Sequence, residues 1–209
     1  MNFINNYLSI LENIKSISKN TTLVVVTKNQ TFENILPLIK IGHRHFGENR
    51  VQEAKLKWQD KIIDDLNLHL IGRLQSNKSD TAVEIFNYIH SLDSEKLALA
   101  LSKSEKKLRK KINYFIQVNI ANELQKGGIL EKELKSFCNF CKHDLNLNII
   151  GLMIIPPVNE DPIFYFKKLK DLSISNNLYD LSMGMSDDYI QALKNGSTFL
   201  RVGSLIFKS

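Results

Sequence analysis

The chain has 209 residues, of which 43% are hydrophobic and 24% charged, and its formal net charge is +6 at pH 7. These values are typical of a soluble globular protein, and the length suits one well-buried domain. The sequence has no run of roughly 18 apolar residues that could span a membrane, and residues 1–20 lack the basic start and apolar core of a signal peptide. We therefore expect a cytoplasmic protein with no membrane partner.

The positive charge raises the question of a nucleic-acid partner. The clearest basic run, residues 103–111, contains no aromatic residue and is interrupted by Glu105. Such a run is more typical of a solvated helix end, so we expect no nucleic acid to bind. Steeply salt-dependent association with DNA or RNA would contradict this expectation.

Helical and strand patterns alternate along the chain. Apolar residues recur at spacings of three and four near the start, which predicts an amphipathic N-terminal helix within residues 1–20. Eight short β-branched or apolar runs follow as predicted strands: 23–27, 45–49, 68–72, 88–93, 114–120, 149–155, 180–185 and 198–203. Segments with helical spacing separate them, including 32–42, 94–108, 131–145, 163–175 and 186–196.

Eight strands separated by helices are the pattern of a single (β/α)8 TIM barrel in the α/β class. The polar segment after the first strand, residues 27–30, is not the glycine-rich loop of an open dinucleotide-binding sheet. Because a minimal barrel takes about 200 residues, the predicted domain spans 1–209, with the N-terminal helix packing on the barrel.

The C-terminal ends of the strands share the face where barrel proteins keep their active sites. In chain order these ends supply Lys28, Glu48, Asn49, Gly72, Asp93, Asn119, Met153, residues 184–188, Gly203 and Ser204. Turn and capping roles explain several of the Asn, Asp and Gly residues. They do not explain a lysine after the first strand, or Arg201 inside the last strand.

Two strand ends together predict a phosphate site. Ser186 opens the predicted helix 186–196, whose first free N–H groups attract an anion. Gly203 permits close approach of the backbone, Ser204 adds a hydroxyl, and Arg201 lies two residues before Gly203 and so points to the same side of the strand. Lys28 can form a Schiff base with a carbonyl. The combination indicates a phosphorylated aldehyde or sugar.

Seven segments, in order from about residue 20 to residue 207, resemble the pyridoxal phosphate homeostasis proteins, also called the alanine racemase N-terminal-domain-like family. They are VVTK, FGENRVQEAKLK, LHLIGRLQSNK, QVNIANELQKGGI, GLMIIPP, LSMGMSDDYIQALKNGST and LRVGSLIF. The chain departs from the family pattern in ending a few residues early and in a compact segment around residues 156–171. Both departures lie away from Lys28 in the sequence.

The resemblance implies a barrel that holds pyridoxal 5′-phosphate as an internal aldimine on Lys28. It places Ser186, Gly203 and Ser204 at the phosphate and Arg201 opposite the pyridine nitrogen. It also implies cofactor contacts from Asn49 beside the ring, Met153 on its face, and Ser182. Lys126 resembles a family lysine that could hold cofactor at a secondary location.

Arg201 bears on whether such a protein is an enzyme. A guanidinium stays charged and accepts no proton, so a ring nitrogen facing it stays unprotonated and the cofactor is a weaker electron sink. Racemases with this barrel add a second domain and an opposing tyrosine, for which 209 residues leave no room. We expect a cofactor carrier or regulator that is not an enzyme; the alternative is a small racemase or lyase acting on amino acids.

Other features have simpler explanations. Cys138 and Cys141 form a C-x-x-C inside a helical segment, and without a second pair they indicate packing rather than a zinc site. His43 and His45 could share a strand face as metal ligands, but no third ligand is near in sequence. Without the second domain that provides racemase dimer contacts, we expect a monomer. Pyridoxal-phosphate-dependent apoenzymes are the expected protein partners.

Overall fold

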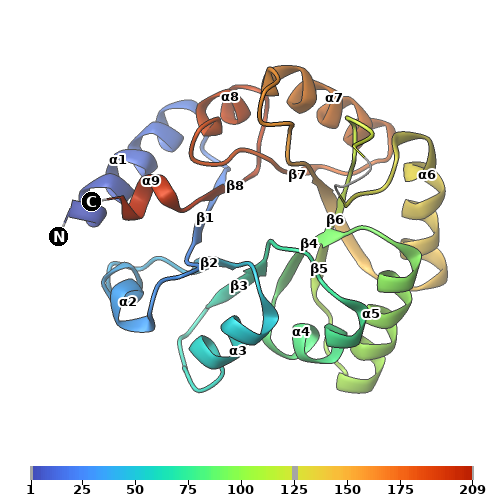
Figure 1. The fold of residues 1–209 in the computed structure, drawn as a ribbon, viewed down its shortest axis with the longest axis horizontal. Helices are drawn as coiled ribbons and strands as arrows, with labels where there is room; N and C mark the ends of the chain where they lie inside the picture. The colour runs from blue at the N-terminus through green and yellow to red at the C-terminus, as the bar shows by residue number, and fades with distance from the viewer. Residues whose placement is uncertain (1, 124–126, 209) are drawn as a thin grey trace.

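The computed structural model describes residues 2–123 and 127–208. Within these residues, eight parallel strands close into a barrel in the order in which they occur in the chain (Figure 1). The strands are β1 (Thr22–Val26), β2 (His45–Glu48), β3 (Asn67–Leu70), β4 (Tyr88–Leu92), β5 (Asn113–Gln117), β6 (Asn148–Met153), β7 (Asp180–Ser182) and β8 (Phe199–Val202). The predicted TIM barrel is confirmed.

Helices surround the barrel and connect successive strands (Figure 1). They are α1 (Asn2–Ile17), α2 (Phe32–Lys40), α3 (Val51–Trp58), the 3-10 turn η1 (Ser76–Lys78), α4 (Ser79–Ile85), α5 (Glu95–Leu108), α6 (Glu131–Asn139), the π-helical turn η2 (Phe140–Asp144), α7 (Pro162–Ser175), α8 (Tyr189–Lys194) and α9 (Ser204–Phe207). Within the described ranges, no helix combines the length and the hydrophobicity that a bilayer crossing demands.

The predicted N-terminal helix forms α1, which lies against α8 and α9 (Figure 1). Asn13 Nδ2 donates to the Tyr189 hydroxyl at 3.0 Å. The rings of Phe3 and Phe207 lie 5.8 Å apart between centroids. The first helix of the chain thus covers the elements that flank the last strand.

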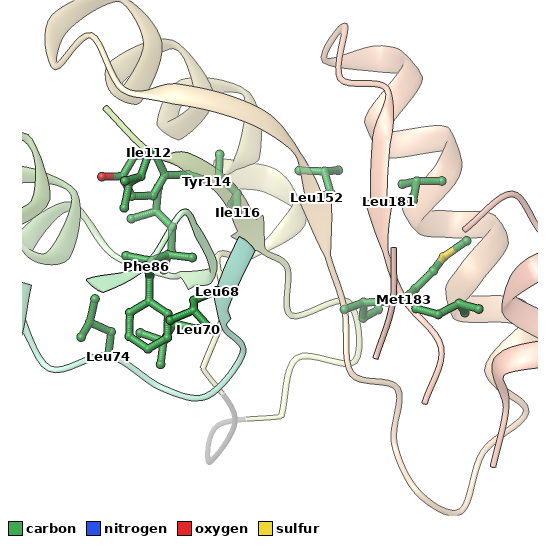
Figure 2. Packing of buried hydrophobic residues seen from close by; sticks show 14 of the residues in the cluster. Leu68, Leu70, Leu74, Phe86, Ile112, Tyr114, Ile116, Leu152, Leu181 and Met183 are labelled. Atoms are coloured by element: carbon green, nitrogen blue, oxygen red, sulfur yellow. The ribbon is translucent and has the colours of Figure 1, made fainter. Parts of the chain in front are cut away.

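The main hydrophobic core lies between the barrel and the helices. Figure 2 shows Leu68 and Leu70 of β3 beside Phe86, with Tyr114 and Ile116 of β5 close by. A second cluster is made by Val24, Phe115, Met153 and Phe199. Because successive side chains of a strand point to opposite faces, neighbouring residues divide between the two clusters, as Val24 and Val25 do. Buried on both faces, β1 reads as an apolar run.

One predicted boundary is wrong. Ser186 does not open a helix, because residues 186–188 form a turn and α8 starts at Tyr189. The Asp188 carboxylate accepts the backbone N–H of Met185 at 2.6 Å and closes this turn. The short polar residues therefore satisfy the backbone locally before the helix begins.

Candidate functional site

A cavity of about 510 Å³ lies at the C-terminal ends of the first and last strands. Its lining includes six of the eight predicted cofactor residues: Lys28, Asn49, Ser186, Arg201, Gly203 and Ser204. Apolar side chains complete the walls: Val26, Ile71, Ile155, Met185 and Phe207. Parallel strands bring these distant segments together because their carboxyl ends share one face of the barrel.

Lys28 stands on a tight turn between β1 and α2. The N–H of Gln30 donates to the carbonyl of Thr27 at 3.0 Å, and Asn29 has a left-handed φ of 64°. Asparagine tolerates that conformation better than most residues. Thr31 then caps α2 by accepting the N–H of Asn34 at 3.3 Å. The turn leaves the Lys28 side chain exposed at the cavity edge.

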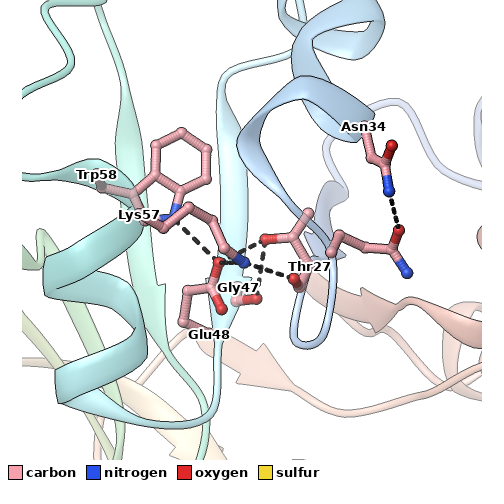
Figure 3. Close-up of polar contacts among 7 residues, drawn as sticks. Thr27, Asn34, Gly47, Glu48, Lys57 and Trp58 are labelled. Atoms are coloured by element: carbon pink, nitrogen blue, oxygen red, sulfur yellow. Dashed lines mark hydrogen bonds and ion pairs between the residues drawn. The ribbon is translucent and has the colours of Figure 1, made fainter.

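The carbonyl just before Lys28 is fixed by a buried ion pair that sequence reasoning did not find (Figure 3). Lys57 Nζ donates to the Thr27 carbonyl at 2.7 Å and pairs with Glu48 Oε1 at 2.8 Å. Glu48 Oε1 also accepts the Thr27 hydroxyl at 2.8 Å and Trp58 Nε1 at 3.0 Å. Glu48 is fully buried, so its charge depends on these donors. The group ties the ends of β1 and β2 to α3.

Arg201 projects from β8 and is buried. Its Nη1 donates to Ser182 Oγ at 2.5 Å, and its Nη2 donates to the carbonyl of Ile154 at 2.9 Å. Burial lowers the pKa of Arg201 to about 10, against the opposing effect of the negative charge of Asp188. The guanidinium is still positively charged at neutral pH. The cavity therefore has one fixed cation in its wall and a second, Lys28, at its edge.

The two serines of the predicted phosphate site meet in the wall of the cavity. Ser204 Oγ donates to Ser186 Oγ at 2.9 Å, and the N–H of Leu205 donates to the same oxygen at 3.2 Å. Since Ser186 Oγ accepts both bonds, its own proton is free to donate elsewhere. A Cβ on Gly203 would lie 2.8 Å from the Val26 carbonyl oxygen, so only glycine fits there. The arrangement suits an anion.

Met153 and Ser182 are not among the residues that line this cavity. Met153 is fully buried in the cluster with Val24, Phe115 and Phe199. Ser182 is also fully buried, and its hydroxyl oxygen lies 2.7 Å from Nδ1 of His90. Both side chains point into the barrel interior, and neither forms part of the cavity wall. The expectation that they touch the cofactor finds no support in this geometry.

A smaller cavity of about 300 Å³ adjoins the first and shares Asn49, Ile71 and Ile155 with it. Its lining includes three charged residues, Arg73, Asp93 and Glu123. Burial raises the pKa of Asp93, while Ser94 and Arg73 oppose the shift. The mouth of the barrel thus offers polar space beyond the volume that Lys28 borders.

The remaining candidate residues have structural roles or fall outside the described chain. Cys138 and Cys141 are buried free thiols, and burial raises their pKa values to about 11 and about 12. His43 Nε2 lies 2.7 Å from the backbone carbonyl of His45. Over residues 2–123 and 127–208, no three His, Cys, Asp or Glu side chains converge as metal ligands would. Lys126 lies outside the described residues.

Comparison with known proteins adds a consistent set of similarities. The family model for the alanine racemase N-terminal domain matches residues 5–209. A pyridoxal phosphate homeostasis protein of Synechocystis is 36% identical over 94% of each chain, and one of Schizosaccharomyces pombe is 37% identical over 91% of this chain and 85% of its own. The structure of PipY of Synechococcus elongatus with PLP bound has a TM-score of 0.86 and 32% identity, covering 98% of this chain and 99% of that chain.

Proposed function

Because the chain belongs to the pyridoxal phosphate homeostasis proteins, which share the barrel of the alanine racemase N-terminal domain, we propose that it binds pyridoxal 5′-phosphate in the 510 Å³ cavity. In this proposal the protein acts in intracellular vitamin B6 homeostasis as a carrier of the cofactor, with effects on amino-acid and keto-acid balance. The observation that carries the proposal is the cavity itself, which brings a lysine, a buried arginine and a pair of serine hydroxyls to one space.

The residues present fit the cofactor by chemistry and by size. The exposed Lys28 amine would bond to the aldehyde carbon, forming a C=N bond and releasing water. The Ser186 and Ser204 hydroxyls and the nearby backbone N–H groups would hold the phosphate. Arg201 would face the ring nitrogen, and Asn49 and the apolar walls would lie along the ring. When bound, the cofactor would supply an electrophilic aldehyde and an electron-withdrawing ring.

The composition of the cavity wall supports a carrier rather than an enzyme. Among the described residues that line it, Asp187 is the one titratable side chain besides Lys28 and Arg201. Efficient proton transfer on a bound amino acid needs a general acid or base positioned across from the lysine. Asp187 is exposed, so no buried, positioned group supplies that function within the described wall.

The test is spectroscopic. Purified protein incubated with pyridoxal 5′-phosphate should show near-visible absorbance of covalently bound cofactor, and Lys28→Ala should abolish it. Borohydride reduction followed by peptide mapping should label Lys28. The matched control is Lys40→Ala, which removes an exposed lysine outside the cavity and should leave the band intact. Labelling at another lysine would overturn the site assignment.

The adjoining cavity favours one alternative, a small racemase or lyase acting on amino acids. Arg73 and Asp93 could recognise the carboxylate and amino groups of such a substrate. Rapid loss of optical activity from L-alanine, at stoichiometric amounts of loaded protein, would favour this alternative and reject the carrier.

The carrier proposal includes transfer of the cofactor to apoenzymes that depend on pyridoxal phosphate, by a protein that is monomeric. A loaded protein mixed with such an apoenzyme should restore its activity faster than the same concentration of free cofactor does. Equal rates of restoration would reject the transfer role.

Sedimentation of the loaded protein should give the mass of a single chain.

A further inference from the structure

Three histidines form a hydrogen-bonded chain inside the barrel. His45 Nδ1 lies 3.0 Å from His69 Nε2, and His69 Nδ1 lies 3.0 Å from His90 Nε2. His90 Nδ1 lies 2.7 Å from Ser182 Oγ, which accepts Nη1 of Arg201 at 2.5 Å. The chain therefore links five strands, β2, β3, β4, β7 and β8, and ends at the guanidinium in the wall of the candidate cofactor cavity.

The inner part of this chain is isolated from solvent. His69 and His90 are fully buried, whereas His45, the first residue of β2, is partly exposed at the opposite end of the barrel from the cavity. His69 stacks on Tyr88 with 4.3 Å between ring centroids, and His90 stacks on Phe115 at 4.4 Å. The stacking fixes the ring planes, so each nitrogen is held toward its hydrogen-bond partner.

The direction of every bond follows from Arg201. A guanidinium only donates, so Ser182 Oγ accepts from it and keeps one proton to donate. Within residues 2–123 and 127–208, the hydrogen-bond partners of Ser182 Oγ are Arg201 and His90. If His90 donated to Ser182, the buried hydroxyl proton would be left without an acceptor, which is unfavourable. Ser182 therefore donates to His90 Nδ1.

That assignment determines the tautomers of the histidines behind it. A neutral His90 that accepts at Nδ1 carries its proton on Nε2 and donates to His69 Nδ1. His69 in turn carries its proton on Nε2 and donates to His45 Nδ1. Burial lowers the pKa values of His69 and His90 well below the ordinary range, in keeping with neutral rings. All the donated bonds then run away from Arg201.

We infer that His90, supported by His69 and His45, is a positioning residue that orients Arg201 toward the ring nitrogen of the bound cofactor. Each imidazole presents its acceptor nitrogen toward the guanidinium, so the chain favours the positive charge without a carboxylate in contact. No ion pair of Arg201 occurs in the described chain. The effect on the cofactor rests on the proposed function; the direction of the bonds does not.

The first test needs no cofactor. In ¹⁵N-labelled protein, the imidazole nitrogen shifts of His69 and His90 should show a neutral ring protonated on Nε2. A proton on Nδ1 of His90, or a charged ring at neutral pH, would overturn the inference. Loss of cofactor binding by the wild-type protein would reject the proposed function and leave this result unaffected.

The second test compares two substitutions of His90 by the dissociation constant of pyridoxal 5′-phosphate. His90→Asn keeps an amide oxygen where Nδ1 accepts from Ser182, and binding should stay within about threefold of wild type. His90→Gln removes the group nearest to Ser182, and its dissociation constant should rise ~tenfold, with a shifted near-visible absorbance maximum. Both variants lose the ring that stacks on Phe115, so a packing effect should be the same in both. Tighter binding by His90→Asn than by His90→Gln would therefore come from the hydrogen bond to Ser182.

Phe115→Leu is the packing control, since it disturbs the neighbour of His90 and keeps every hydrogen bond of the chain. Its dissociation constant and absorbance maximum should match wild type even where its stability is lower. Equal behaviour of His90→Asn and His90→Gln would overturn the inference. If either variant fails to fold, the nitrogen shifts of the wild-type protein still decide it.

Discussion

At the scale of single residues, the site depends on charges that are buried beside it. Glu48 is fully buried next to the strand end that carries Lys28, and it accepts three hydrogen bonds on one oxygen. Its other oxygen, Oε2, has no hydrogen-bond partner among the described residues. The buried Glu48 carboxylate depends on the positive charge of Lys57, because an unpaired charge away from water is strongly unfavourable.

We expect Lys57→Met to destabilise the fold by about 3–5 kcal/mol, because it leaves Glu48 buried with an uncompensated charge. It should also weaken cofactor binding by releasing the Thr27 carbonyl that precedes Lys28. Denaturant unfolding of the empty protein measures the first effect. Lys55→Met is the matched control on the same helix, since Lys55 is partly exposed and pairs with Glu84 at the surface. An unchanged free energy of unfolding for Lys57→Met would contradict this account.

Some of these residues are recognisable in the sequence and others are not, for identifiable reasons. Lys28 and Arg201 stood out because each breaks an apolar strand pattern, and the cavity contains both. Lys57 gave no such signal, because a lysine near the end of an exposed helix is ordinary. Its role depends on how α3 packs on the barrel. The family resemblance implies cofactor contacts for Ser182 and Met153, and these stay predictions, although neither residue lines the cavity.

At the scale of elements, the turn between β1 and α2 sets the position of Lys28. The left-handed Asn29 and the cap at Thr31 are both local, and both were accessible from residue type. The predicted start of a helix at Ser186 was wrong, since Asp188 bonds back to Met185 and delays the helix to Tyr189. When several Ser, Asp or Asn residues follow one another, each of them can cap a helix or close a turn. Which of these occurs depends on the packing of neighbouring elements.

Thr31→Ala should lower the free energy of unfolding by about 1 kcal/mol, because it removes the acceptor for the N–H of Asn34. Thr31→Ser keeps the hydroxyl and should be close to wild type, so the pair separates capping from side-chain size. Thermal or urea unfolding of the three proteins measures the difference. If alanine and serine behave alike, the cap contributes nothing to α2.

At the scale of the whole molecule, the barrel buries histidines on both sides of its wall. His43 lies among the outer core residues, with its Nδ1 3.1 Å from the Tyr7 hydroxyl, while His69 and His90 lie inside. The general alternation of strand and helix was predictable because eight apolar runs recur at regular intervals. The interior histidines were not, since a polar residue in a strand reads equally well as solvent-facing.

These histidines predict a dependence of stability on pH. Burial lowers the pKa of His43 to about 4 and also lowers those of His45, His69 and His90. In the unfolded chain these histidines take up protons near pH 6.5, whereas in the folded protein they do so only at lower pH. The free energy of unfolding should therefore be highest above pH 6.5 and should fall as the solution is acidified toward the folded pKa values. As the pH falls below 6.5, the contribution of each strongly shifted histidine to the slope should rise toward a limit of about 1.4 kcal/mol per pH unit.

Urea unfolding at several values between about pH 7 and pH 5.5 measures this slope, above the range where aspartates dominate. His43→Asn should reduce the slope, and the exposed His143→Asn serves as the control. A free energy of unfolding that stays constant over this range would contradict burial of neutral histidines.

The pairing of β1 with β8 has a further consequence for how the protein is made and kept loaded. Val24 pairs with Arg201 and Val25 with Val202, so the cavity lies where the first strand of the barrel, β1, pairs with the last, β8. If the cofactor binds in this cavity as proposed, a growing chain cannot hold it until β8 has been synthesised and has paired with β1. The free energy of binding would then stabilise the β1–β8 pairing, which joins the strands that lie farthest apart in the sequence. Bound cofactor would hold β1 and β8 together, and the loaded barrel would unfold more slowly than the empty one.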